Sequence, residues 1–273
     1  MLKSSFTRVL FGAVVAALAL VASLSADHSW GPYQWARQAN PFTLTVVDST
    51  TVDWDDEVTN SVRDWSVSSV LDMRKVEGST DGARQCKPPS GQIRICNLTY
   101  GFVGWVGLAG ITIDPNGHIT TGYTKLNDSY LNSASYSSWR QGVVCQEVGH
   151  DIGLDHQDED FDNDPLKSCM DYQDPLWPTP NAHDYDQLEA IYAHLDSYNS
   201  YVTLGETDGE GGGDSGGCNA PPGKGCNKLG FGPGNSQSEW GISLGRRGRH
   251  EKFIRIDADG TRHITFVTWA DGH

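Results

Sequence analysis

Side chains suited to chemistry are concentrated in eleven consecutive residues that read Gln-Glu-Val-Gly-His-Asp-Ile-Gly-Leu-Asp-His. On a helix, Gln146 and His150 lie one turn apart on the same face, and Glu147 lies beside them. Gly153 then permits a sharp turn, because glycine adopts positive φ angles without a Cβ penalty. We expect this turn to bring His156 back toward His150, so that two imidazoles and a carboxylate meet at one point.

Two imidazoles beside a carboxylate predict a catalytic zinc site. Such a zinc ion usually has about three protein ligands and an open position for water. A carboxylate that does not bind the metal can take the proton of that water. On these grounds His150 and His156 are predicted zinc ligands, and Glu147 is the predicted general base. The alternative is that both histidines are ordinary surface residues of a helix.

The same stretch resembles the zinc signature of the metzincin metallopeptidases, His-Glu-x-x-His-x-x-Gly-x-x-His, with its first histidine replaced by Gln146. Downstream, the sequence Ser-Cys-Met-Asp-Tyr resembles the Met-turn of the same clan. The resemblance implies that Met170 forms a hydrophobic floor beneath the metal. It also implies that Tyr172 helps to bind the metal or to stabilise the transition state. With the helix that follows, the two motifs are similar to those of matrixin-like peptidases over residues 42–195.

The glutamine at the first ligand position leaves three interpretations open. The carboxamide oxygen of Gln146 can bind zinc with help from Tyr172, although the usual protein ligands are Cys, His, Asp and Glu. A carboxylate, from Asp155 or Asp160, can complete the ligand set instead. The third interpretation is a degenerate site that binds metal poorly.

An acidic cluster follows His156, and alternating carboxylates of this kind can hold Ca²⁺. Its members are Asp158, Glu159, Asp160, Asp162 and Asp164. The glycine that an EF-hand loop requires is missing, so a helix-loop-helix calcium site is excluded. Ca²⁺ is therefore a candidate second metal, and a solvated acidic loop is the alternative.

The N-terminal residues 1–26 are typical of a secretory signal peptide, with a basic start before an apolar run that is too short to span a bilayer comfortably. We expect a secreted protein with no membrane contact after cleavage; a membrane anchor is the alternative. The net charge of −15 argues against nucleic-acid binding, which needs clustered positive charge. A short basic run, Arg246, Arg247 and Arg249, is interpreted as a solvated face.

Export would place the six cysteines in an oxidising compartment, where disulfides form. The pairs favoured by proximity are Cys86–Cys96, Cys218–Cys226 and, from the remaining two, Cys145–Cys169. The last pair would tie the predicted zinc helix to the segment that resembles the Met-turn. Free thiols are the alternative.

Hydrophobic periodicity predicts both helices and strands. The predicted helices cover residues 53–65, 135–152 and 181–195, and the predicted strands cover residues 42–47, 67–76, 92–100, 104–114, 118–124, 252–256 and 263–269. The expected fold class is α+β: a metzincin-like twisted mixed sheet with an active-site helix and a C-terminal helix, plus a small β-hairpin tail. The expected domains are a metallopeptidase domain at 27–204, an acidic glycine-rich linker at 205–217 and a disulfide-containing β tail at 218–273.

These features predict a secreted zinc-dependent endopeptidase in which Glu147 activates a water molecule. The expected substrate is an extended peptide or protein. Residues 107–114 are a candidate edge strand with which the substrate pairs by strand addition. The alternative is a metzincin-like fold that has lost its activity and binds peptides or glycans outside the cell.

Overall fold

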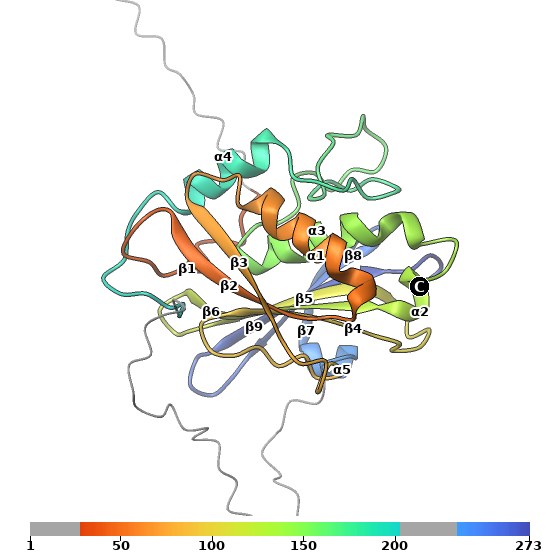
Figure 1. Ribbon diagram of the computed structural model, residues 1–273, viewed down its shortest axis with the longest axis horizontal. Helices are drawn as coiled ribbons and strands as arrows, with labels where there is room; N and C mark the ends of the chain where they lie inside the picture. Colours follow the sequence, from red (N-terminus) through yellow and green to blue (C-terminus); the bar gives the residue numbers. More distant parts are fainter. Residues whose placement is uncertain (1–27, 203–233) are drawn as a thin grey trace, which may run out of the picture.

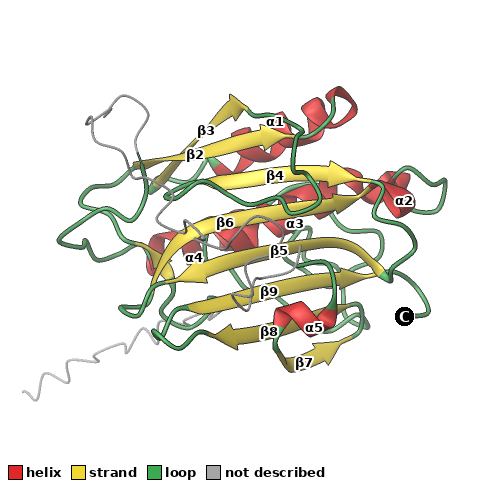
Figure 2. Cartoon of the chain, turned by 90° about the horizontal axis from the view of Figure 1, so that it is seen from below, coloured by secondary structure: helices red, strands yellow, loops and turns green. Residues whose placement is uncertain are grey.

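The computed structural model describes residues 28–202 and 234–273. The fold is α+β, as the sequence predicts, and a large mixed sheet runs through the molecule (Figure 1). The longer helices pack on one face of this sheet (Figure 2); they are α1 (Asp55–Trp65), α3 (Arg140–Asp151) and α4 (Ala182–Ile191). A short helix, α5 (Gln237–Trp240), lies on the opposite face (Figure 1).

The strands are β1 (Gln34–Trp35), β2 (Phe42–Ser49), β3 (Leu71–Glu77), β4 (Ile93–Leu98), β5 (Trp105–Ile113), β6 (His118–Asn127), β7 (Ile242–Arg247), β8 (His250–Ile256) and β9 (Arg262–Trp269). Their order in the sheet is β3-β2-β4-β6-β5-β9-β8-β7, with β1 beside β6. Pairing is parallel from β3 to β6 and antiparallel from β6 to β7. The sheet is therefore mixed, with one parallel and one antiparallel half.

The predicted helices form, with shifts at their ends. Helix α1 follows a short 3₁₀ turn (Val52–Trp54), and α4 begins after Asn181, whose side chain accepts a hydrogen bond from the Asp184 amide. Helix α3 begins later than expected because residues 137–139 form a 3₁₀ turn. A further short helix, α2 (Asp128–Leu131), follows β6. The strand expected at 67–76 begins only at Leu71, since residues 66–70 form turns.

Close packing fixes helix α3 at the centre of the molecule, where every residue from Gly142 to Asp151 is buried. A Cβ added at Gly149 would lie 2.5 Å from Met170 Sδ and 2.8 Å from the Trp65 ring. The Trp65 indole also donates a hydrogen bond of 3.0 Å to the Cys145 carbonyl. Glycine at position 149 thus lets helix α1 and the segment of Met170 approach the helix that carries the predicted site.

The C-terminal hairpin differs from expectation. Strands β8 and β9 form as predicted, but they extend the main sheet, because β9 pairs with β5 from Trp105 to Ile113. The expectation that β5 is an edge strand is therefore wrong, since β5 lies between β6 and β9. Nearly all residues of β5 are buried, which is typical of an interior strand covered on both faces.

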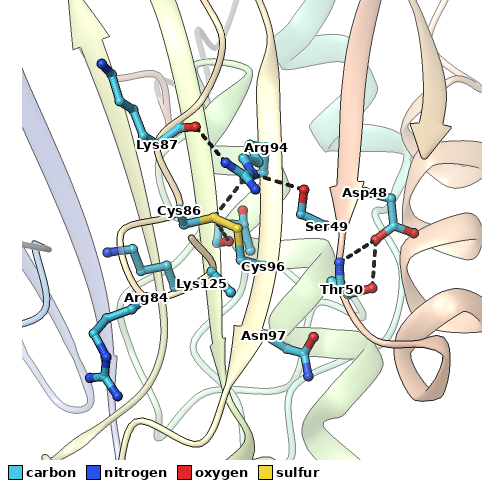
Figure 3. The surroundings of a disulfide bond; sticks show 12 residues. Asp48, Ser49, Thr50, Arg84, Cys86, Lys87, Arg94, Cys96, Asn97 and Lys125 are labelled. Carbon is cyan, nitrogen blue, oxygen red and sulfur yellow. Dashed lines mark hydrogen bonds between the residues drawn. A yellow bond between two sulfur atoms is a disulfide. The ribbon is translucent and has the colours of Figure 1, made fainter. Parts of the chain in front are cut away.

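Two of the three predicted disulfides are present in the described residues, Cys86–Cys96 and Cys145–Cys169. Figure 3 shows the first of them beside Arg94, whose guanidinium donates hydrogen bonds to Ser49 Oγ (3.0 Å) and the Lys87 carbonyl (3.1 Å). The second links α3 to the segment that contains Met170. Disulfides fit the predicted export to an oxidising compartment.

Several predictions fall outside the described residues. These are the signal peptide, the linker at 205–217 and the pair Cys218–Cys226. Within residues 28–202 and 234–273, no helix is long and apolar enough to cross a membrane.

Replacing Gly153 by Ala should destabilise the fold more than replacing Gly117 by Ala. Both glycines have similar positive φ angles, 101° and 97°, so each alanine should carry a backbone strain of about 1–3 kcal/mol. At Gly153 the new Cβ would also lie 2.9 Å from the Tyr33 carbonyl, whereas nothing lies within 4 Å at Gly117. Denaturant unfolding measures both losses, and equal losses would contradict the close approach at Gly153.

Candidate functional site

The turn after helix α3 brings His150 and His156 together. Their ring centroids lie 4.6 Å apart, with the ring planes at 80°. The turn is held by backbone hydrogen bonds from Gly153 N to the His150 carbonyl (3.1 Å) and from Leu154 N to the Gly149 carbonyl (3.1 Å). Glycine at 153 adopts the positive φ that this reversal requires.

Both imidazoles are buried and suited to bind a metal ion. Burial lowers the pKa of His150 and of His156 well below the ordinary value, so both rings are neutral at neutral pH. The carbonyl of Leu154 can only accept, so His150 Nδ1 (2.8 Å away) is the donor, which leaves a lone pair on Nε2. Neither ring nitrogen of His156 has a hydrogen-bond partner among the described residues. These two side chains therefore fit a zinc ion.

The carboxamide of Gln146 is engaged with the protein. Its Nε2 donates to the Cys169 carbonyl (3.1 Å), and its Oε1 accepts from the Thr268 hydroxyl (3.0 Å). In this conformation Thr268 uses one of the two lone pairs of the oxygen that could bind a metal. Of the three ligand interpretations, direct ligation by Gln146 would use the second lone pair of this oxygen.

Thr268 also contacts the predicted general base, because its hydroxyl lies 2.8 Å from Glu147 Oε1. A hydroxyl has one hydrogen, so it cannot donate to Gln146 and to an ionised Glu147 at the same time. Burial raises the pKa of Glu147 to about 8, and the bond to Thr268 lowers it to a smaller extent. A protonated Glu147 can donate to Thr268, which then donates to Gln146. Glu147 Oε2 has no hydrogen-bond partner among the described residues.

The two alternative carboxylate ligands have other partners. Both oxygens of Asp155 accept hydrogen bonds from the Lys252 ammonium, at 3.0 and 2.8 Å. Asp155, His156 and Glu159 offer possible ligand atoms within 4.8 Å of one another, but Lys252 also lies 3.2 Å from Glu159. The Lys252 ammonium thus already contacts both of these carboxylates. Asp160 is not in this group, and its Oδ1 accepts from the Asp162 amide (2.9 Å).

The rest of the acidic cluster forms turns of its own. Asp158 Oδ1 accepts from the Asp160 amide (2.8 Å), and Asp158 Oδ2 accepts from the Asn163 side chain. Glu159 pairs with Arg247 at 2.8 Å. These contacts hold the loop in its conformation. Binding of Ca²⁺ by the cluster stays a prediction.

Met170 and Tyr172 lie beside the histidines. Met170 is fully buried and faces Gly149, the residue before His150. The ring of Tyr172 lies 4.4 Å from the ring of His156. Burial raises the pKa of Tyr172, so its hydroxyl remains a hydrogen-bond donor at neutral pH. The fold therefore brings together the residues that the sequence predicts, except that Gln146 is turned to other partners.

Three site residues from the C-terminal hairpin were not predicted. The ring of Phe266 stacks on His150, with centroids 3.9 Å apart and planes at 6°. The ring of His250 lies 4.6 Å from His156 and 4.2 Å from Tyr172. Thr268 contacts Gln146 and Glu147. The alternation in residues 263–269 places Phe266 and Thr268 on one face of a strand, but nothing local indicates that this face covers α3.

The free energy of unfolding should fall less steeply with rising pH when Glu147 is replaced by Gln. In the unfolded chain a glutamate loses its proton near its ordinary pKa of 4.5, whereas in the folded chain the pKa of Glu147 is about 8. Between these values the folded state binds more protons, so stability falls as pH rises. Glutamine carries no such proton.

The measurement is the free energy of unfolding at about pH 5 and about pH 8, for the wild type and for this variant. Glu77→Gln is the matched control, because the Glu77 side chain is 85% exposed. The loss of stability between the two pH values should be smaller for Glu147→Gln than for either other protein. An unchanged loss would contradict a buried, protonated Glu147.

The likeness to metzincin peptidases is carried by Glu147, His150, Gly153, His156 and the segment around Met170. All of them lie on α3, in the turn that ends it or against it. No protein-family model matches the chain, and no curated protein matches it in sequence.

Proposed function

We propose that the chain is a secreted zinc-dependent endopeptidase whose reaction centre is formed by Glu147, His150 and His156. The observation that carries the proposal is the pair of neutral, buried imidazoles with ring centroids 4.6 Å apart, in which His156 has no hydrogen-bond partner among the described residues. Zinc is the proposed ion because neutral imidazole is one of its usual ligands. Glu147 precedes His150 by three residues on the same helix.

Zinc bound at the histidines would polarise the scissile carbonyl and lower the pKa of a water molecule. Glu147 takes the proton of this water at a carboxylate oxygen and later delivers it to the leaving amine. Tyr172, which stays protonated, donates its hydroxyl hydrogen to the developing oxyanion. His150 is oriented for its task by the hydrogen bond from Nδ1 to the Leu154 carbonyl.

In the described conformation the C-terminal strand lies where an extended substrate would pair. Strand β9 runs antiparallel along the whole of β5, and Phe266 covers His150. Binding of a peptide to β5 by strand addition therefore requires β9 to separate from it. The same movement would hydrate Glu147 and lower its pKa, since burial is the main cause of the raised value. We infer that this conformation is a closed form of the enzyme.

A second candidate function is supported by Gln146. Its amide already donates to the Cys169 carbonyl and accepts from the Thr268 hydroxyl, and a carboxamide is not among the usual protein ligands of zinc. A chain that binds metal poorly would retain the fold and bind peptides or glycans without hydrolysing them. Peptide binding without cleavage in the zinc-loaded protein would favour this second function.

Replacing Glu147 by Ala should reduce the cleavage of an unfolded protein by at least about 100-fold, because general-base catalysis contributes roughly 10²–10⁴ to the rate. The zinc content should stay unchanged, since Glu147 is not a proposed ligand. Replacing His150 and His156 together should remove about one zinc ion per chain and abolish chelator-sensitive cleavage. Glu77→Ala is the control and should change neither. Cleavage that survives Glu147→Ala would contradict the proposed mechanism.

A disulfide between β5 and β9 should abolish cleavage by keeping the strands together. Thr112 and His263 lie directly opposite each other in these strands, away from Glu147, so cysteines at both positions would form the lock. The variant Thr112→Ser with His263→Ser is the matched control without a crosslink. A crosslinked protein that cleaves as fast as this control would show that β9 is not in the path of the substrate.

Replacing Phe266 by Ala should act in the opposite direction. A buried Phe→Ala change removes about 3–5 kcal/mol, and each loss of about 1.4 kcal/mol from the closed form raises the open fraction about tenfold. We therefore expect cleavage at least about tenfold faster than in the wild type, provided that circular dichroism shows a folded chain. An unchanged or slower rate in the folded variant would contradict the closed form.

A further inference from the structure

A second group of possible metal ligands lies where the N-terminal segment meets helix α4. His28, His183 and Asp184 each offer one ligand atom, and these atoms all lie within 4.8 Å of one another. His28 is 3% exposed and Asp184 is 0% exposed. The two imidazole rings are stacked, with centroids 4.8 Å apart. None of these residues belongs to the proposed reaction centre.

Each of the three residues has one polar side-chain atom that lacks a partner. His28 Nε2, His183 Nδ1 and Asp184 Oδ1 are buried and have no hydrogen-bond partner among the described residues. A buried polar atom without a partner destabilises the fold, so three of them within one group of residues require an explanation. The distance from His28 Nε2 to Asp184 Oδ1 is 3.8 Å, which is too long for a hydrogen bond.

The remaining polar atoms of His28 and Asp184 are held in place. His28 Nδ1 lies 3.0 Å from the Asp155 carbonyl and must donate to it, which leaves a lone pair on Nε2. Asp184 Oδ2 accepts from Ser168 Oγ (2.6 Å) and from the Asn181 amide (2.7 Å), which leaves Oδ1 available. Supporting bonds of this kind orient the ligands of protein metal sites.

From this geometry we propose that His28, His183 and Asp184 bind a divalent transition-metal ion of the Zn²⁺ class. Two imidazoles and one carboxylate suit Zn²⁺ and its neighbours, whereas Ca²⁺ prefers oxygen ligands throughout. With bonds of about 2.0–2.1 Å in a tetrahedral arrangement, ligand atoms lie roughly 3.3–3.5 Å apart. The 3.8 Å between His28 Nε2 and Asp184 Oδ1 must therefore shorten by a few tenths of an ångström, and the other separations, which are below 4.8 Å, by at most about 1.5 Å.

The bound ion would join three segments of the chain. His28 lies near the N-terminal end of the described residues, and its Nδ1 contacts the backbone next to His156. His183 and Asp184 lie in the first turn of α4, and Asp184 also holds Ser168 in the segment that precedes Met170. We therefore expect the ion to have a structural role, stabilising the loops on either side of the proposed reaction centre.

The test separates this site from the proposed reaction centre. In the purified full chain, His150 and His156 are first replaced by Ala, so that metal bound there no longer contributes. After treatment with a chelator and dialysis, Zn²⁺ alone is added, and bound zinc and the melting temperature are measured. This background should still bind about one zinc ion per chain, and its melting temperature should rise with zinc.

Adding His183→Ala to this background should weaken zinc binding by about 100-fold and abolish the rise in melting temperature. His183→Gln, which preserves more of the side-chain volume, should do the same and guards against a simple folding defect. His194→Ala is the matched control, because the His194 side chain is 66% exposed and is not in the group. The proposal is overturned if the background binds no zinc, or if the His183 variants bind it as tightly as the control. Neither result bears on the proposed reaction centre, because His150 and His156 have been replaced in all of these proteins.

Discussion

The burial of helix α3 is the constraint on which the rest of the structure depends. Every residue from Gly142 to Asp151 is shielded from solvent, although the helix carries Glu147, His150 and Asp151. Removing such groups from water is costly unless they gain partners or lose their charge. Thr268 and Thr124 place hydroxyls on the two carboxyl groups, burial raises the pKa of both acids, and burial lowers the pKa of His150. Strands from both halves of the chain are therefore arranged around the polar groups of one helix.

Structural features that depend on residues close together in the sequence could be predicted from it. The periodicity of α1 and α3, the glycine turn that brings His156 to His150, and the proximity of the cysteines are local signals, and the structure contains the corresponding elements. The pairing of β9 with β5 joins segments that are far apart in the sequence, so no local pattern specifies it. For the same reason Phe266 and Thr268 were missed, and β5 was expected at an edge. Its nearly continuous apolar run was the available sign that it is an interior strand.

The contacts that hold the C-terminal hairpin differ in strength. Arg246 and Arg247 are exposed, as the prediction of a solvated face requires, whereas Arg249 is half-buried. Arg247 pairs with Glu159 at 2.8 Å and Arg249 with Asp174 at 2.8 Å. Partly exposed pairs of this kind contribute about 0–1 kcal/mol each and weaken with salt. Burial of a phenylalanine contributes about 1.5–3 kcal/mol. The apolar contact of Phe266 and the strand pairing therefore hold β9 in place, while the ion pairs help to set its position beside the acidic loop.

The position of β9 in the chain has a consequence for synthesis. Strand β5 is complete at Ile113, but its second neighbour is not made until residues 262–269 have been added. In a growing chain, one edge of this apolar strand has unpaired backbone N–H and C=O groups, and such edges readily pair with other chains. Residues 262–269 both give β5 its second neighbour and cover His150. A chain without residues 262–269 would lack both the second partner of β5 and the cover of His150.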